Sequence, residues 1–128
     1  MDTTENITSE NMSDVKEVVP VKFIHLRAHS AYSLLEGALK PAVLANAALR
    51  FETPAIGVTD RNNFFGALEI SEKLSDIGVQ PIIGVTLSLR GLELPGRDQH
   101  DLPSIALFAQ NETGYLNLLS IVSRAHLE

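Results

Sequence analysis

The chain has 128 residues, of which 45% are hydrophobic and 20% are charged, and it contains no cysteine. These proportions are ordinary for a small globular unit with a packed core, and the lack of cysteine excludes disulfides and thiolate metal sites. A formal net charge of −6 disfavours non-specific binding to nucleic acid, which needs clustered lysine and arginine. The sequence shows neither a long apolar run nor a secretory signal, so we expect a cytoplasmic protein without a membrane span.

The first 20 residues differ from the rest of the chain. They carry five acidic residues against one lysine and no aromatic residue. Such a composition buries too little apolar surface to order itself, so we predict a disordered acidic leader over residues 1–20. Residues 21–128 hold eleven acids and nine bases and are predicted to form the folded part.

Short apolar runs alternate with amphipathic stretches in the folded part. The expected elements, in chain order, are strand 21–27, helix 41–51, strand 54–59, helix 65–77, strand 80–89, a loop or hairpin connection over 91–103, strand 104–109 and a helix capped by Asn111 or Thr113. Pro41 suits a first helical turn, and Gly78 suits a left-handed helix end. This alternation predicts a parallel sheet with right-handed crossovers, whose strand-end loops meet at one rim.

Ionisable residues gather directly after the first two expected strands. His25, Arg27 and His29 alternate, so on a strand they would share a face. One interpretation is a metal site that uses His25 or His29 with Glu36 and Asp60. The other is that His25 is a hydrogen-bonded core histidine, His29 caps the following loop and Asp60 is a turn residue. The spacing leaves both open.

Two serines near His29 raise the question of a nucleophile. Ser30 and Ser33 lie close to this histidine in the sequence. A serine nucleophile needs a strained turn and a third orienting group, and neither is evident in the sequence. Serine catalysis is therefore not indicated.

Several stretches of the sequence resemble a known family. Residues 25–37 (HLRAHSAYSLLEG), 59–69 (TDRNNFFGALE) and 81–85 (PIIGV), followed by 111–118 and 123–127, closely resemble the N-terminal PHP (polymerase and histidinol phosphatase) domain of bacterial DNA polymerase III α subunits. The resemblance implies an α/β fold, a partial (β/α) PHP barrel that is the first half of a distorted seven-stranded TIM-like barrel. A complete β/α barrel takes roughly 200 residues or more.

The same resemblance identifies positions where metal-bearing members keep ligands. Their motifs read His-x-His-Ser, Leu-Leu-Asp-Gly, Thr-Asp-His and Pro-Ile-Ile-Gly-x-Glu. The corresponding residues here are Arg27, His29, Glu36, Arg61 and Thr86, with His25 and Asp60 as neighbours on the rim. Only His29 and Glu36 keep ligating groups, which implies a degenerate site with no bound metal and no catalytic residue. We also expect the guanidinium groups of Arg27 and Arg61 to fill the former metal positions and to pair with Glu36 or Asp60.

The function implied by the resemblance is that of a structural and interaction domain in a replicative polymerase. Its expected partners are the remainder of the α subunit and the proofreading exonuclease subunit, while other domains of the subunit contact DNA and hold Mg²⁺ at the polymerase active site. A half barrel alone leaves an unpaired sheet edge, so we expect self-association of the piece. The alternative is a free-standing metal-dependent phosphoesterase of the histidinol-phosphatase type.

Overall fold

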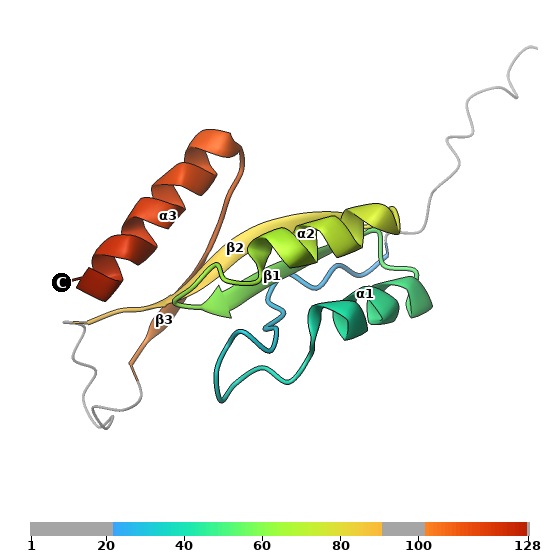
Figure 1. Ribbon diagram of the computed structural model, residues 1–128, viewed down its shortest axis with the longest axis horizontal. Coiled ribbons are helices and arrows are strands. Elements are labelled where there is room, and N and C mark those ends of the chain that lie inside the picture. The colour runs from blue at the N-terminus through green and yellow to red at the C-terminus, as the bar shows by residue number, and fades with distance from the viewer. Residues whose placement is uncertain (1–21, 91–101, 128) are drawn as a thin grey trace, which may run out of the picture.

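The computed structural model describes residues 22–90 and 102–127, so the acidic leader expected at 1–20 lies outside the described residues (Figure 1). The elements are α1 (Pro41–Arg50), β1 (Ala55–Arg61), α2 (Ala67–Asp76), β2 (Gln80–Ser88), β3 (Ser104–Phe108) and α3 (Glu112–Leu127). Each lies within two residues of its predicted bounds wherever both bounds were predicted. Hydrophobic periodicity is therefore a sufficient guide to the elements after residue 40.

The expected first strand is the exception. Residues 22–27 run beside β1 with a bend at Leu26, and they form no strand. Within the described residues, the backbone pairing of this segment with β1 consists of a single bridge between Ala28 and Val58 and a few hydrogen bonds, including Gly57 N to the His25 carbonyl at 2.6 Å. Phe23 and Leu26 stay exposed to solvent. The strand predicted for 21–27 is wrong because these few contacts do not extend into a continuous ladder.

The sheet has three strands in the order β1-β2-β3. β1 and β2 are parallel, as expected, with Ala55 opposite Gln80. β3 is antiparallel to β2, with Ser88 opposite Ser104, so the expectation of a fully parallel sheet is wrong. Leu89 N donates to the Pro103 carbonyl at 2.8 Å beyond the ends of both strands, so the antiparallel pairing continues past them. Residues 91–101 of the predicted loop or hairpin connection lie outside the described residues.

All three helices pack on one face of this sheet. One core cluster places Leu44 of α1 and Ile70 of α2 against Ile56 and Val58, while another places α3 on Val85 and Leu87. Val58 is opposite Ile83 in register, and Ile83, Val85 and Leu87 alternate along β2, so both clusters belong to the same face. Figure 1 shows α1 and α2 beside β1 and β2, with α3 toward β3.

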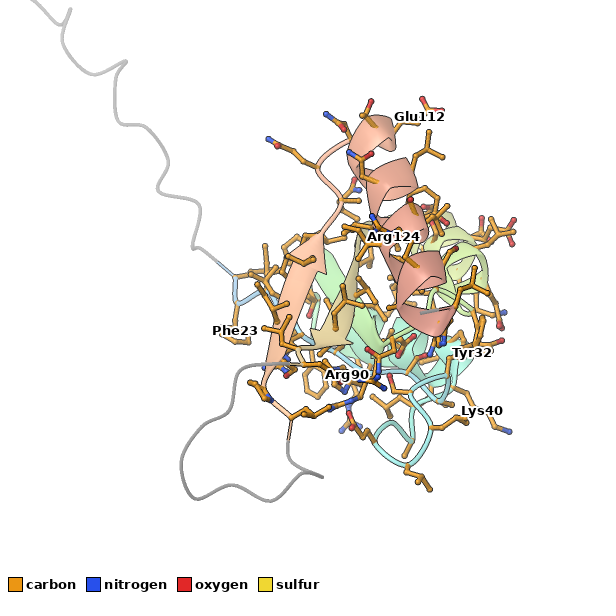
Figure 2. The ribbon with its side chains drawn as sticks, turned by 90° about the vertical axis from the view of Figure 1, so that its left-hand side faces the viewer. Phe23, Tyr32, Lys40, Arg90, Glu112 and Arg124 are labelled. Atoms are coloured by element: carbon orange, nitrogen blue, oxygen red, sulfur yellow. The ribbon has the colours of Figure 1, made fainter. Side chains whose placement is uncertain are left out.

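The other face of the sheet carries small and polar side chains over much of β1 and β2, together with the apolar Ile82 and Phe108. Gly57, Thr59 and Arg61 alternate along β1, and Gly84, Thr86 and Ser88 alternate along β2. Residues from the segment 22–29 reach this face, as the contact of His29 with Thr86 shows. Figure 2 shows the side chains around the strands from the side. We call this surface the helix-free face.

Local signals at the helix ends behave as the sequence predicts. Pro41 is the first residue of α1. Gly78, just past α2, has φ of +75°, a conformation that costs glycine little. The Asn111 side chain accepts a hydrogen bond from Gly114 N at 2.8 Å and so caps α3. Within residues 22–90 and 102–127, no helix is both long and apolar enough to cross a membrane.

Candidate functional site

Four of the predicted site residues meet at the carboxyl ends of β1 and β2. Glu36 lies between two of them, with one carboxylate oxygen 2.9 Å from Arg61 Nη1 and the other 3.6 Å from His29 Nδ1. The remaining ring nitrogen of His29 lies 3.5 Å from Thr86 Oγ1. The strand-end loops therefore converge on one rim, as the topology predicts. We call His29, Glu36, Arg61 and Thr86 the rim cluster.

Arg61 is the basic centre of the rim cluster. One terminal nitrogen pairs with Glu36, and the other donates to Ser88 Oγ at 3.2 Å. The expected pairing of Arg61 with Glu36 is confirmed. The two side chains are 31% and 37% exposed, so water screens the pair and its contribution to stability is small.

Arg27 takes a different partner from the one expected. Its Nη2 donates to Ser104 Oγ at 3.1 Å, and among the described residues it contacts neither Glu36 nor Asp60. The expectation that it pairs with one of those carboxylates is wrong. The reason is the direction of β3: an antiparallel β3 begins at the rim and so places its first residue, Ser104, within reach of the guanidinium.

Asp60 is buried and anchors the loop after residue 29. One of its oxygens accepts hydrogen bonds from Ser30 N at 2.6 Å and Ser33 Oγ at 2.7 Å, and the other accepts from Ser30 Oγ at 2.7 Å. Ser33 Oγ in turn accepts from Arg61 N at 2.9 Å. Asp60 lies within β1 and is 4% exposed, so it is not the turn residue that one interpretation proposed.

The role of the two serines was not evident from the sequence. Ser30 and Ser33 are both fully buried, and each donates its hydroxyl to Asp60. We call Ser30, Ser33 and Asp60 the serine cradle. The sequence feature that could have indicated this role is the pair of serines itself. Buried hydroxyls need a hydrogen-bond partner, and a carboxylate at a neighbouring strand end is the strongest acceptor within reach.

The turn after the serine cradle delivers Glu36 to the rim. Gly37 N donates to the Ser33 carbonyl at 2.8 Å, which folds the loop back on itself. A Cβ at Gly37 would lie 1.8 Å from the Ser30 carbonyl oxygen, so only glycine allows this close approach. Leu35 has φ of +67° and is fully exposed. The Leu-Leu-Glu-Gly sequence thus forms a tight turn that presents Glu36.

His25 does not join this cluster. It is exposed, with its ring edge packed against Phe23 at a centroid distance of 4.7 Å. The interpretation of His25 as a core histidine is therefore wrong. Within residues 22–90 and 102–127, no three or more His, Cys, Asp or Glu side chains are grouped so as to hold a metal ion.

Two further hydrogen bonds connect α3 and α2 to the loops next to the rim cluster. His126 Nε2, near the end of α3, lies 2.7 Å from the Asn62 carbonyl oxygen, and since a carbonyl only accepts, this nitrogen carries the proton. Tyr32 donates its hydroxyl to Glu69 at 2.9 Å. This hydrogen bond, together with the negative charge of Glu69, raises the pKa of Tyr32 above 10.0. Sequence reasoning assigned neither contact.

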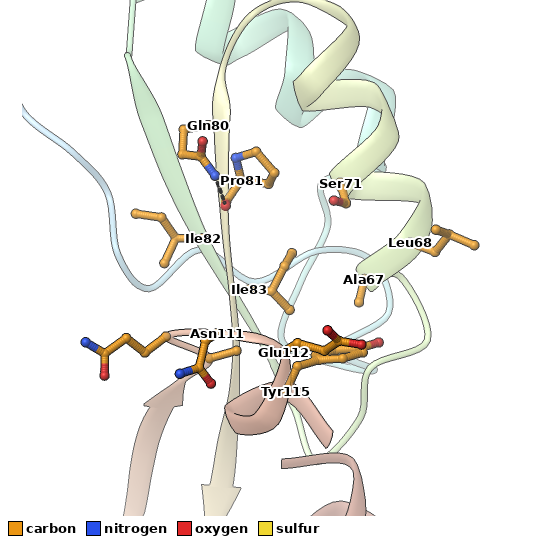
Figure 3. Close-up of a pocket in the computed structure, with 12 residues that line it drawn as sticks. Ala67, Leu68, Ser71, Gln80, Pro81, Ile82, Ile83, Asn111, Glu112 and Tyr115 are labelled. Carbon is orange, nitrogen blue, oxygen red and sulfur yellow. Dashed lines mark hydrogen bonds between the residues drawn. The ribbon is translucent and has the colours of Figure 1, made fainter. Parts of the chain in front are cut away.

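A pocket of about 470 Å³ lies away from the rim, between α2, β2 and the start of α3 (Figure 3). Its walls include Ala67, Ile83 and Tyr115, and Glu112 is the acidic residue in its lining. The β2 residues in this lining are Gln80–Ile83, at the opposite end of the strand from Thr86 and Ser88. The pocket is therefore separate from the rim cluster.

Comparison with known proteins identifies the class of domain. The PHP domain profile matches residues 25–128, and the chain belongs to the PHP domain family. The curated relatives named DNA polymerase III subunit alpha include those of Caulobacter vibrioides (48% identical over 107 residues), Borreliella burgdorferi (37% over 111) and Buchnera aphidicola (36% over 105). These matches cover 82–84% of this chain but only 9–10% of each relative.

A solved structure shares the fold. It is a protein of Bifidobacterium adolescentis assigned as a metal-dependent phosphoesterase, with a TM-score of 0.55 and 17% sequence identity. The match covers 79% of this chain and 33% of that chain. At this identity the likeness concerns the fold alone. It agrees with a mixed α/β architecture.

Proposed function

We propose that this chain is the N-terminal PHP portion of a replicative DNA polymerase III α subunit, with a structural and interaction role in DNA replication. The curated relatives support this assignment, since the chain spans about a tenth of their length. In this proposal polymerisation, its Mg²⁺ and the contacts to DNA belong to other parts of the subunit. The cytoplasm is the proposed location.

The observation that carries the structural role is the ion pair between Arg61 and Glu36 at 2.9 Å. A divalent cation needs several nitrogen and oxygen ligands that are free to coordinate it. Here one imidazole and one carboxylate remain, the carboxylate is paired with a guanidinium, and both oxygens of Asp60 accept hydrogen bonds from serine. This donor set does not fit a tightly bound metal ion, which supports a degenerate site.

Metal analysis of the purified chain tests this proposal. After incubation with zinc or manganese and removal of excess ions, we expect clearly less than one ion per chain. A matched variant carries Arg27→His, Arg61→His and Thr86→Glu, which restores the ligand types of metal-bearing relatives, and should retain more metal. One ion per wild-type chain, lost on His29→Ala, would refute the degenerate site.

The proposed architecture is the first half of a (β/α) barrel. β3 is the last strand of the sheet, and apolar side chains including Phe23, Phe65 and Leu68 are more than 70% exposed. In the whole subunit, the remainder of the α chain and the proofreading exonuclease subunit are the proposed partners for such surfaces. In isolation they favour self-association, which sedimentation at several concentrations measures.

A metal-dependent phosphoesterase is the second candidate. The fold of the Bifidobacterium adolescentis protein and the retained pair of His29 and Glu36, 3.6 Å apart, favour it. It predicts metal-dependent turnover of a simple phosphate monoester that Glu36→Gln abolishes. We expect no turnover, because Arg61 holds the carboxylate that a metal would need.

A further inference from the structure

We propose that Arg27, Arg61, Ser88 and Ser104 form a metal-free binding site for a small phosphate-class oxyanion on the helix-free face. The proposal rests on the degenerate rim proposed above, because it assigns to guanidinium groups the anion recognition that a metal would otherwise supply. It concerns binding and includes no catalytic step.

The first argument is that two separate contacts meet at one cross-strand pair. Arg61 donates to Ser88 Oγ at 3.2 Å, and Arg27 donates to Ser104 Oγ at 3.1 Å. Ser88 and Ser104 are directly opposite each other in the β2–β3 ladder, and Cβ atoms in such pairs lie about 5 Å apart on one face. Two guanidinium groups from distant parts of the sequence therefore flank two neighbouring hydroxyls.

The second argument is the donor chemistry. Each serine oxygen accepts from an arginine, which leaves its own O–H to donate, and a guanidinium carries five N–H donors. Within residues 22–90 and 102–127, Arg27 has one hydrogen-bond partner, the neutral Ser104. Two planar cations beside two hydroxyl donors match the oxygens of a phosphate group, which arginine binds in a bidentate manner.

The third argument is the local charge. Glu36 balances Arg61 at 2.9 Å, and the buried Asp60 is satisfied by Ser30 and Ser33. The charge of Arg27 has no such counterpart among the described residues, so the described part of this face has an excess positive charge. The whole chain has a net charge of −6, which disfavours an extended polyanion such as DNA. A free phosphate or diphosphate is the ligand that fits both facts.

Calorimetric titration of the 128-residue chain with sodium phosphate and with sodium diphosphate, both in EDTA, tests the site. We expect binding of at least one of the two without metal, weakened about tenfold by Arg27→Gln, since a hydrogen bond to a charged group contributes about 1.5 kcal/mol or more. Arg50→Gln is the matched control, because Arg50 lies in the last turn of α1, and it should leave affinity unchanged. Ser104→Ala should weaken binding less than Arg27→Gln does.

The outcomes separate this proposal from the proposed function. Absence of binding to both anions, or equal affinity in wild type and Arg27→Gln, refutes the oxyanion site and leaves the degenerate rim intact. Binding that appears only with added zinc or manganese and is lost on His29→Ala refutes both. Titration with an oligonucleotide that lacks a terminal phosphate tests DNA as the ligand. Tighter binding to this oligonucleotide than to diphosphate would overturn the assignment to a small anion.

Discussion

The serine cradle and the rim cluster lie side by side, and each is built around one carboxylate. Asp60 is 4% exposed and accepts three short hydrogen bonds from Ser30 and Ser33. Glu36 is far more exposed and contacts Arg61 and His29. The first carboxylate fixes the backbone of the loop, whereas the second balances charge at the surface. The comparison shows that burial and the type of partner decide whether a carboxylate at this rim fixes the loop backbone or balances surface charge.

Removal of the buried carboxylate should have the largest effect. Asp60→Ala leaves two serine hydroxyls and one backbone N–H without their acceptor, so we expect a loss of about 3 kcal/mol in the free energy of unfolding. Urea denaturation followed by circular dichroism measures it. Asp76→Ala, at the exposed end of α2, is the control and should change stability little. Equal losses in the two variants would show that the serine cradle is not structural.

The exposed pair of the rim cluster should contribute much less. In a double-mutant cycle of Arg61→Gln and Glu36→Gln we expect a coupling free energy of about 0.5 kcal/mol, because both side chains are about one third exposed. The coupling should shrink further in about 1 M salt, where charges are screened over a few ångströms. A salt-insensitive coupling similar in size to the Asp60→Ala effect would remove the contrast between the two regions.

The smallest effect concerns Tyr32, whose backbone amide and carbonyl contact Ser30 and Asn63. Its pKa is raised above 10.0 by the hydrogen bond to Glu69. The contribution of this bond to stability is therefore complete below about pH 10 and is lost as the pH rises through the higher folded-state pKa. Tyrosinate absorbance against pH measures the midpoint. Glu69→Gln should lower the titration midpoint of Tyr32. Comparison with Tyr32→Phe shows which part of the absorbance change belongs to Tyr32. An unchanged midpoint in Glu69→Gln would contradict the assigned cause.

The sequence is a good guide to the elements and to the rim, for reasons that are local. Periodicity and end signals such as Pro41, Gly78 and Asn111 act within one or two helical turns, and they place α1, α2 and α3. The meeting of Glu36 with Arg61 follows from the parallel bridge between Ala28 and Val58, because the loop after this segment then lies at the carboxyl end of β1.

What the sequence does not reveal depends on distant pairing. The direction of β3 decides whether Ser104 begins at the rim, and that direction is a property of the hairpin and not of the five residues of the strand. The partner of Arg27 changes with it. Similarly, Ser30 and Ser33 look like any polar loop residues until the neighbouring strand brings the Asp60 carboxylate to them.

The hairpin between β2 and β3 also has a practical consequence. Leu89 and Pro103 are joined by a backbone hydrogen bond of 2.8 Å, so residues 90 and 102 leave and re-enter the fold at adjacent points beside Ser88 and Ser104. Doubling the length of a connection with fixed ends costs only about 0.6 kcal/mol. A fluorophore-bearing or affinity-tag insertion between these points would therefore report on the rim while leaving the strand register unchanged.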